Sequence, residues 1–495
     1  MLRGMIQHIL ILGAGTAGLL AALTLKMKLP HLKVEVLRSP DIGVIGVGEG
    51  TNITFPVHMF EYLGVSKERF YSLVDPTWKL GIRFLWGSRP DFFYPFATEF
   101  SGRFPEVTRA NATYLGEKDR WIGPISALMA HDKAFPRNAN GRPEMHDYTA
   151  FHLENRRLVG GLEVLCREAG VEVTDGTLSR AERGSEGIAA LNLTDSRRVK
   201  ADLYVDASGF RSELMGQAMA EPFISFSRSL YCDRAVVGGW KRKPGETILP
   251  YTLAETMEAG WAWRIDHEDL INRGYVYSSP FLSDDDARAE FLRKNPRVDP
   301  ETTRVVKFVS GRRARAWVGN CVCIGNAGGF VEPLEATAIQ VICQQSATLT
   351  KGLAECQCQP SDAMRSLYNR FVSKDWDDIR DFLSIHYRFN TRLDNPFWRA
   401  CRSDVDLGGA LEMTEFWKAH GPSAIPNGLL IWAGSSFGLE GYFSLLKGQD
   451  VPVSKPYQPT AAEKTAWRRR LDGYGSMARN ACSAEEAIAA FRVMA

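Results

Sequence analysis

The sequence lacks an excess of charge of either sign. Lys and Arg total 60 and Asp and Glu total 58 in 495 residues, which gives a formal net charge of +2. Chains that bind nucleic acid or an anionic membrane surface usually carry a clear basic excess. Charge therefore gives no reason to expect either partner, and we predict no binding to nucleic acid or to membranes.

Cysteine is also scarce, with nine residues in the whole chain. This is too few for a disulfide-rich secreted scaffold. Two pairs, Cys321/Cys323 and Cys356/Cys358, have the spacing Cys-x-Cys, which is unsuited to a structural disulfide and lacks the second half of a zinc site. We expect nine reduced thiols, no metal and a cytoplasmic protein.

Long hydrophobic runs are missing apart from one near the N-terminus. Gly4 to Leu25 contains no Asp, Glu, Lys or Arg, which leaves a signal peptide as an alternative interpretation. The glycines within Gly13–Gly18 interrupt this run. No other window approaches a membrane span, and the ordinary composition of 45% hydrophobic and 24% charged residues indicates a soluble globular protein.

The N-terminal segment has the pattern of a βαβ unit. An apolar strand over Ile6–Leu12 is followed by Gly13-x-Gly15-x-x-Gly18 and a helix-forming stretch that ends before Pro30, and Leu32–Leu37 is the next strand. In this context the glycines predict a dinucleotide site, because they allow a tight turn, close approach of a pyrophosphate and close helix packing. The alternative is an incidental glycine-rich turn.

Further α/β segments lie much later in the chain. The expected strands are Gly170–Thr174, Asp202–Asp206 and Cys321–Ile324, with glycine-containing loops at Asp206–Gly209 and Gly325–Gly329 and a helix over Leu334–Leu349. Several loops favour the long FAD molecule over a nicotinamide, for which no second glycine fingerprint is present.

The predicted fold class is therefore α/β, a Rossmann-like FAD-binding fold with an inserted β-sheet and a mostly helical C-terminal region. The expected domains are a discontinuous FAD-binding module at 1–214 and 305–350, an inserted substrate-side β-sheet at 215–304, and a helical substrate cover at 351–495.

Four motifs resemble those of the flavin-dependent halogenases of the tryptophan halogenase family. They are Gly13-Ala14-Gly15-Thr16-Ala17-Gly18, Ile45-Gly-Val-Gly-Glu49-Gly50-Thr51, Trp261-Ala-Trp263-Arg-Ile265 and Gly328-Gly-Phe-Val-Glu-Pro-Leu-Glu335-Ala-Thr337. Lys79 falls where the family has its essential lysine. The resemblance implies a fold of the flavin monooxygenase type.

The resemblance also implies roles for individual residues. FAD, used as FADH2 with O2, would give a flavin hydroperoxide that oxidises halide to hypohalous acid, which travels to Lys79 while Glu335 assists. Halide would bind at Thr337 and Ala338, and Trp261 and Trp263 would lie along the passage to the substrate. The implied cofactor-binding residues are Gly13, Ala14, Gly15, Thr16, Ala17, Gly18, Ser39, Ile42, Ile45, Glu49, Gly50, Asn326 and Ile339.

Each of these side chains also has an ordinary structural interpretation. Lys79 by composition alone is a surface lysine, although the strand pattern that follows it makes an inward-facing lysine plausible. An acidic residue such as Glu335 is favoured at a helix start in any case. Two alternating tryptophans on one strand face, Trp261 and Trp263, most often form core packing.

The sequence departs from the family pattern at four positions. Asp266 replaces the proline that closes the tryptophan motif, Ala336 replaces a serine after the glutamate, Ala338 replaces a glycine at the halide position, and Arg38 stands where an acid usually binds the ribose. No C-terminal segment matches the family lid that clamps free tryptophan. We therefore expect indole, an indole derivative or another electron-rich arene as substrate, with bromide and chloride both open.

The resemblance implies that a separate NAD(P)H-dependent flavin reductase supplies reduced FAD, since the sequence has no nicotinamide fingerprint. Two other functions remain open at this point. One is a flavin-dependent aromatic monooxygenase, which Lys79 and the two tryptophans count against. The other is a non-catalytic FAD-binding protein, which the departures at Ala336 and Ala338 keep open. The sequence does not predict an oligomeric state.

Overall fold

The computed structural model describes residues 5–43, 48–100, 120–145 and 149–494. Its contacts divide the chain into two units, each discontinuous in sequence. Unit 1 comprises Met1–Asp75, Leu153–Phe226 and Phe308–Asp377, and unit 2 comprises Pro76–His152, Ser227–Lys307 and Asp378–Ala495. The chain thus leaves unit 1 and returns to it twice. This division differs from the sequence-based bounds chiefly at 76–152, which the prediction assigned to the FAD-binding module.

Unit 1 is built on a mainly parallel six-stranded sheet. Its order is β20 (Trp317–Val318), β21 (Cys321–Cys323), β12 (Leu203–Asp206), β1 (His8–Leu12), β2 (Lys33–Arg38) and β8 (Glu172–Asp175). All neighbouring pairs are parallel except β20 with β21. β1 is buried over four of its five residues, as its near-continuous apolar sequence predicts for a central parallel strand.

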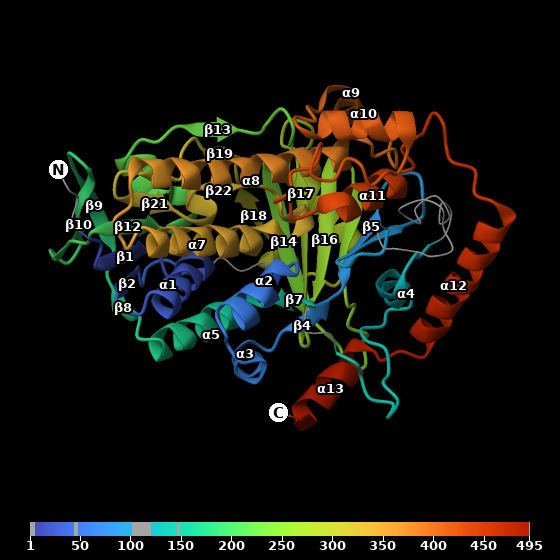
Figure 1. Cartoon of the computed structure of the whole chain (residues 1–495), viewed down its shortest axis with the longest axis horizontal. Coiled ribbons are helices and arrows are strands. Elements are labelled where there is room, and N and C mark those ends of the chain that lie inside the picture. The colour runs from blue at the N-terminus through green and yellow to red at the C-terminus, as the bar shows by residue number, and fades with distance from the viewer. Residues whose placement is uncertain (1–4, 44–47, 101–119, 146–148, 495) are drawn as a thin grey trace. The chain divides into compact units, whose positions relative to one another are not determined.

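Several helices belong to unit 1 in whole or in part. They are α1 (Thr16–Lys28), α2 (Thr54–Pro56), α3 (Lys67–Val74), α5 (Asn155–Glu168), α7 (Thr337–Glu355) and the long α8 (Asp362–Arg388), which runs across the boundary between the units. α1 contacts both α5 and α7 (Figure 1). All residues from Gly18 to Leu25 are buried, because a helix that is apolar on every side needs neighbours on every side.

Smaller elements complete unit 1. One three-stranded sheet contains β9 (Leu178–Gly184), β10 (Gly187–Leu193) and β11 (Arg198–Val199), and another contains β13 (Phe223–Ser225), β19 (Gly311–Arg313) and β22 (Gly329–Phe330). The two-residue strand β3 (Glu49–Gly50) also belongs to this unit.

Unit 2 contains a seven-stranded sheet. Its order is β18 (Arg304–Lys307), β14 (Arg234–Lys241), β17 (Leu270–Tyr277), β16 (Gly260–Asp266), β15 (Thr252–Met257), β5 (Gly81–Leu85) and β6 (Phe92–Pro95). Tyr275 and Tyr277 alternate along β17 and pack with Phe291 of α6 (Asp284–Lys294) in one hydrophobic cluster. The predicted inserted β-sheet is therefore present, with a helix packed on it.

Two short strands stand apart from that sheet in unit 2. β4 (Thr77–Lys79) and β7 (Ala150–Leu153) form an antiparallel pair. The remaining helices are α4 (Pro124–Ala130), α9 (Pro396–Asp404), α10 (Ala410–His420), α11 (Gly438–Gly448), α12 (Ala461–Arg479) and α13 (Ala484–Met494). The mostly helical C-terminal region and the α/β fold class predicted from the sequence are confirmed.

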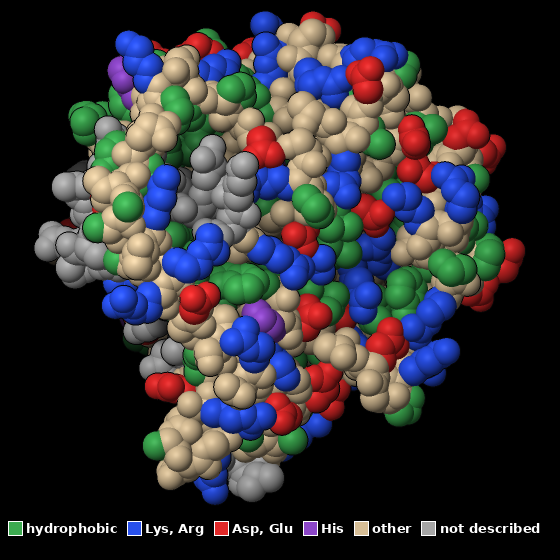
Figure 2. All heavy atoms as spheres, turned by 90° about the vertical axis from the view of Figure 1, so that its right-hand side faces the viewer, with side chains coloured by type: hydrophobic (Ala, Val, Ile, Leu, Met, Phe, Trp, Pro, Cys, Tyr) green, Lys and Arg blue, Asp and Glu red, His purple; other side chains and the backbone are tan. Residues whose placement is uncertain are grey.

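The surface matches the balanced composition. On the face shown in Figure 2, the described Lys and Arg side chains are interspersed with Asp and Glu side chains. Among the residues that the structure describes, no helix is both long and apolar enough to cross a membrane.

Candidate active site

The glycine loop of unit 1 closes tightly around the start of α1. Gly13 has φ +113°, and a Cβ placed there would lie 2.5 Å from the Ala207 carbonyl oxygen. A Cβ on Gly18 would lie 1.8 Å from the Gly13 carbonyl oxygen. A Cβ on Gly15, in contrast, would meet no described protein atom within 4 Å. The fold itself therefore requires glycine at positions 13 and 18, whereas the backbone at Gly15 faces open space.

That open space lies at the positive end of a helix. Gly15 is the N-cap of α1, makes no side-chain cap, and no acidic residue occupies the first turn. The first N–H groups of a helix have no partner within the helix and carry partial positive charge. The arrangement suits a pyrophosphate, so the residues predicted to hold one, Gly13 to Gly18, fit that group.

Two later loops lie beside the glycine loop. The turn after β12 touches it through Ala207, and Gly325, after β21, would place a Cβ 2.9 Å from the Ala17 Cβ. β1, β12 and β21 are parallel, so their carboxyl ends share one edge of the sheet. Three loops at one edge form the extended cradle expected for FAD rather than a shorter ligand.

Asp206 is the buried carboxylate that shapes the second loop. It accepts hydrogen bonds from the Leu214 and Met215 N–H groups at 2.9 and 2.8 Å and from the Ser208 Oγ at 2.5 Å. Burial raises the pKa of Asp206, and these hydrogen bonds oppose that rise. Its role in the described structure is to hold the turn next to the glycine loop.

The other predicted cofactor residues of unit 1 lie on several elements. Ser39 follows β2, and its Oγ is 2.9 Å from the Thr177 Oγ1. Glu49 on β3 accepts a hydrogen bond from the Asn155 Nδ2 at 3.2 Å, and loss of water raises its pKa. The others are the adjacent Gly50, the exposed Ile42, Asn326 in the turn after β21 and the buried Ile339 in α7; Ile45 lies outside the described residues.

Arg38 does not offer a free charge for a ribose or a 2′-phosphate. Its guanidinium pairs with Glu163 at 2.8 Å and with Asp175 at 2.6 Å. These partners raise the pKa of Arg38. Arg38, which stands in place of the usual acidic residue, therefore joins β2 to α5 and to β8 through two ion pairs.

The segment around Glu335 is a tight turn followed by a helix. Glu335 ends a single 3₁₀ turn over Pro333–Glu335 and is buried. Ala336 then adopts a left-handed conformation with φ +57° and ψ +38°, and α7 starts at Thr337 without a side-chain cap or an acidic first turn. The N–H groups of Thr337 and Ala338 are thus at an uncapped helix start, which is a suitable place for an anion.

Lys79 lies on the short strand β4 of unit 2. Its side chain is 1% exposed, although lysine is almost never fully buried unless a charge partner or a function compensates the cost. The Nζ atom is 4.9 Å from the centroid of the Phe96 ring, which is a cation–π distance. Lys79 is therefore an inward-facing strand residue, which is one of the two interpretations that the sequence left open, the other being a surface lysine.

The two tryptophans of the motif share one face of β16. Their rings are 6.0 Å apart at an interplanar angle of 52°, and both are buried. A Cβ on Gly274, which is opposite Trp263 in β17, would lie 2.0 Å from the Trp263 ring. The missing side chain of Gly274 thus makes the room that Trp263 occupies.

Asp266, the departure at the end of the tryptophan motif, is fully buried in unit 2. Its carboxylate pairs with Arg264 at 2.7 Å and with Arg242 at 3.0 Å. Its backbone oxygen accepts a hydrogen bond from the Thr77 Oγ1 at 2.6 Å. The end of β16 is in this way tied to the strand that carries Lys79.

Sequence reasoning missed two residues beside Lys79, namely Phe96 and His152. Phe96 carried no signal, since one aromatic residue among many has no distinctive spacing. His152 lies on the strand paired with β4, and a single buried histidine in a short apolar run most often has a purely structural role. Either residue can be identified only when it is known which segments, far apart in the sequence, lie side by side in the fold.

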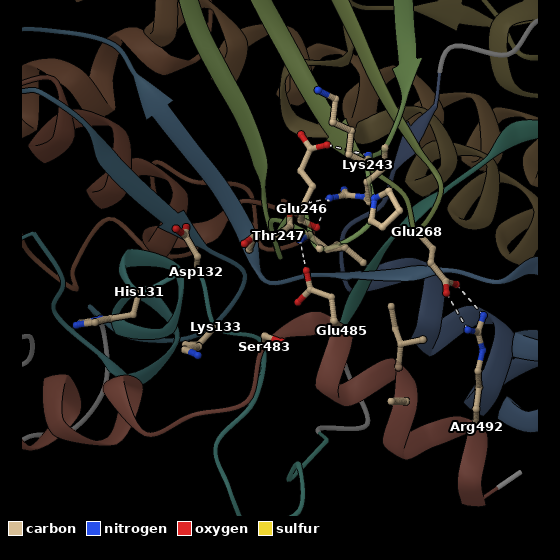
Figure 3. Close-up of a pocket in the computed structure, with 16 residues that line it drawn as sticks. His131, Asp132, Lys133, Lys243, Glu246, Thr247, Glu268, Ser483, Glu485 and Arg492 are labelled. Atoms are coloured by element: carbon tan, nitrogen blue, oxygen red, sulfur yellow. Dashed lines mark hydrogen bonds and ion pairs between the residues drawn. The ribbon is translucent and has the colours of Figure 1, made fainter. Parts of the chain in front are cut away.

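A separate cavity of about 820 Å³ lies in unit 2 and is lined by none of the described predicted site residues. Charged side chains line this cavity, among them Lys133, Lys243 and, from α13, Glu485 and Arg492 (Figure 3). Arg492 of α13 pairs with Glu268 across two contacts of 2.7 Å. The volume of this cavity therefore gives no support to the predicted site, whereas the unusual buried lysine draws attention to β4. Among the described residues, no cluster of His, Cys, Asp and Glu could hold a metal ion.

The glycine loop, the two loops beside it and the parallel sheet define unit 1 as an FAD-binding fold of the flavin monooxygenase type. Comparison with known proteins defines the chain further. The model of the tryptophan halogenase family matches residues 8–464, which reaches far beyond the last motif recognised in the sequence. The chain belongs to the tryptophan halogenase family.

Individual relatives agree with this assignment. The chain is 34% identical to tryptophan 7-halogenase KtzQ of a Kutzneria species over 85% of this chain and 83% of that protein. The solved structure of MibH, a lathipeptide tryptophan 5-halogenase, matches with TM-score 0.89 and 36% identity over 99% of this chain and 94% of that one. BrvH, a flavin-dependent halogenase from Brevundimonas sp. BAL3, matches with TM-score 0.85 and 27% identity over 98% and 99% of the two chains. The protein is accordingly a flavin-dependent halogenase, an oxidoreductase.

Proposed function

We propose that the protein uses reduced FAD, O2 and bromide or chloride to halogenate the indole ring of tryptophan or of a tryptophan derivative, with Lys79 receiving the oxidised halogen. The observation that carries this proposal is the almost complete burial of the Lys79 side chain on β4. Burying an ammonium group costs free energy, and a role in delivering a reactive halogen explains why the protein keeps a lysine there.

FAD would be held by the residues of unit 1 from Gly13 to Gly18, with Ser39, Ile42, Ile45, Glu49, Gly50, Asn326 and Ile339 around it. When bound in its reduced form, FAD supplies the two electrons with which O2 converts halide to hypohalous acid and water. The open space at Gly15 supports this placement, because the backbone there can approach a phosphate.

Halide would bind at the start of α7 through the N–H groups of Thr337 and Ala338. This helix start has neither a side-chain cap nor an acidic residue in its first turn, so its N–H groups can donate to an anion. The methyl group of Ala338 limits the space beside the ion. Bromide is easier to oxidise than chloride, and we expect bromide to be the faster substrate.

Lys79 would hold hypohalous acid either by hydrogen bond or as a haloamine. When the ring carbon attacks bound hypohalous acid, the halogen–oxygen bond breaks and the leaving hydroxide takes up a proton to become water. A haloamine would form from the neutral Lys79 amine with release of water, and attack by the ring carbon would then break the nitrogen–halogen bond, with the amine taking up a proton. Glu335 would polarise the oxidant or accept the proton of the halogenated ring carbon. Trp261 and Trp263 would line the route of the oxidant and keep the substrate away from the flavin.

Two relatives guide the choice of substrate. One is named a tryptophan 7-halogenase and the other a lathipeptide tryptophan 5-halogenase. Both act on tryptophan, so we propose its indole ring as the target, either in the free amino acid or within a peptide. Their named positions of attack differ, one being a 7-halogenase and the other a 5-halogenase.

The reducing partner would be a separate NAD(P)H-dependent flavin reductase, since the sequence has one dinucleotide fingerprint and FAD would occupy it. All nine cysteines are free thiols in the structure, and eight of them are buried. Free thiols persist in a reducing compartment, which supports a cytoplasmic location.

The test is a reaction of the full chain with FAD, a flavin reductase, NADH, O2 and either bromide or chloride. L-tryptophan, indole and a short tryptophan-containing peptide serve as parallel substrates, with products identified by mass spectrometry. A halogen isotope pattern on any of these three supports the proposal and ranks the substrates. Hydroxylated product would show a monooxygenase instead. Absence of any modified product, with the FAD-loaded protein present, would contradict the proposal.

A further inference from the structure

The face of β4 that carries Lys79 is shared with β7. The register pairs Thr77 with His152 and Lys79 with Ala150. Directly opposite residues of an antiparallel pair point to the same face, as do residues two apart on one strand. Thr77, Lys79, Ala150 and His152 therefore lie on one face, and all four are buried. His152 is the diagonal neighbour of Lys79, within reach of a long side chain.

The neighbours of Lys79 on this face differ in size. Ala150, directly opposite, contributes only a methyl group and leaves room for the lysine stem. Thr77 is fixed in place, because its hydroxyl donates to the Asp266 backbone oxygen at 2.6 Å. The imidazole of His152 is the largest of the three neighbouring groups, so its position limits where the Lys79 stem can lie.

His152 is itself anchored from a second strand. Its Nε2 lies 2.9 Å from the Thr252 Oγ1, a hydrogen bond between buried groups. Thr252 begins β15 of the large sheet of unit 2. An anchored ring loses its freedom to rotate away, and the buried hydroxyl would be left unpaired if the ring were removed.

A neutral His152 ring is compatible with a lysine ammonium group beside it. Burial lowers the pKa of His152 well below its usual range, and the charges of Lys79 and then His267 lower it further. The ring is therefore neutral at physiological pH. A second positive charge in this buried space would repel the Lys79 ammonium strongly, because the interior screens charges poorly.

We propose that His152 is a positioning residue for Lys79: its ring, held by Thr252, fixes the lysine stem so that Nζ stays at the Phe96 ring. The inference rests on the proposed role of Lys79 as the receiver of hypohalous acid. His152 touches neither the cofactor nor the substrate in this scheme and acts only through the lysine.

The test separates formation of the oxidant from its delivery. Ring-halogenated product and free hypohalous acid, captured by a 1,3-diketone, are measured together for wild type, His152→Ala, His152→Gln and Thr252→Val. A displaced Lys79 should lower kcat for the aromatic substrate by up to about 100-fold, the cost of a misplacement of about 1 Å. KM should change little, and the trapped oxidant should stay at or above the wild-type level.

The two milder variants guard against misfolding. Glutamine keeps an amide that can bond to Thr252, so His152→Gln should recover most of the lost product. Thr252→Val keeps the shape, removes the anchor and should fall between wild type and His152→Ala. His386→Ala is the matched control, since that ring is also fully buried in unit 2 but lies on α8; it should lose stability without releasing more oxidant.

Several results would overturn the inference. One is wild-type product from His152→Ala or, if that variant does not fold, from Thr252→Val. Another is a parallel loss of product and trapped oxidant in a folded variant, or no recovery by His152→Gln. Adding His152→Ala to Lys79→Ala should cause no further loss of product. Normal product from Lys79→Ala alone would instead contradict the proposed function, which keeps the two failures distinguishable.

Discussion

The two units present their functional groups in different ways. In the proposed scheme unit 1 uses mainly the backbone: helix starts at α1 and α7, a turn with positive φ at Gly13, and glycines where a Cβ would collide, with Glu335 as its one proposed catalytic side chain. Unit 2 uses side chains, above all Lys79 and His152 on two paired strands. Backbone sites depend on a few consecutive residues, whereas side-chain sites depend on register between distant segments. The two kinds of site should therefore fail differently when mutated.

The largest effect is expected in unit 2. Lys79→Ala removes the group that we propose to hold the oxidant, and ring-halogenated product should fall by at least about 100-fold, in the range typical for loss of a catalytic acid or base. FAD affinity should not change, because the cofactor residues lie on the other unit. Product is measured by mass spectrometry and FAD affinity by flavin fluorescence. Lys307→Ala, on the edge strand β18, is the matched control and should behave as wild type.

Within unit 1, substitutions at two glycines should have separate effects, one on the stability of the fold and the other on the affinity for FAD. Gly18→Ala forces a Cβ to within 1.8 Å of a backbone oxygen and should destabilise the fold by about 3 kcal/mol or more. Gly15→Ala meets no described protein atom, so the apo protein should keep its stability while FAD affinity falls about tenfold or more. Urea unfolding and flavin titration measure the two effects. Equal losses of stability in both variants would contradict this distinction.

The pH dependence of stability should have opposite signs in the two units. In unit 2, burial raises the pKa of Glu99 from 4.5 to about 7. The folded protein then binds its proton more tightly than the unfolded chain, so this carboxyl costs stability increasingly as pH rises from about 4.5 to about 7. In unit 1, burial lowers the pKa of His58 from 6.5 to about 4, so stability is lost as pH falls from about 6.5 to about 4.

Each of these contributions amounts to up to about 3 kcal/mol. Denaturant unfolding at a series of pH values measures them, with Glu99→Gln and His58→Gln as the variants. Glu99→Gln should remove the loss of stability above pH 4.5, because the glutamine side chain does not titrate. Its oxygen can still accept the hydrogen bonds of the Ile125 and Ser126 N–H groups, so the local structure should be kept. His58→Gln should remove the loss below pH 6.5. Unchanged profiles would show that neither group is responsible.

The smallest expected effect concerns the turn before α7. Ala336 has φ +57°, a conformation that costs an L-residue with a Cβ about 1 kcal/mol more than glycine. Ala336→Gly should raise the free energy of unfolding by roughly that amount, less the extra chain entropy of glycine, while halide affinity stays unchanged. Denaturant unfolding and halide dependence of the rate check the two statements. Ala338→Gly is the useful partner, since it should affect the halide and not the turn.

The motifs of the sequence predicted unit 1 better than unit 2. The glycine spacing, the parallel strands and the start of α7 were all predicted within a few residues, since each is encoded locally. The recognised motifs stopped near residue 345, whereas the family match reaches residue 464. The later helices are specified by amphipathic patterns that many sequences satisfy, so they carry no short motif to recognise.

The departures from the family pattern illustrate the same limit. In the sequence, Asp266 and Arg38 were only unexpected residues at motif positions. In the structure, Asp266 is buried between two arginines, and Arg38 joins β2 to its neighbours through Glu163 and Asp175. Whether a charge is compensated depends on partners that are distant in the sequence, and no local pattern identifies them.

The sequence by itself predicted the α/β fold and its dinucleotide site, because glycine spacing and hydrophobic period act over short stretches of chain, and its resemblance to the motifs of the family indicated the halogenase. Only the tertiary structure decided that Lys79 is buried over Phe96 and that His152 stands beside it on the same face. Register between β4 and β7 sets those neighbours, and register follows from the packing of the whole unit.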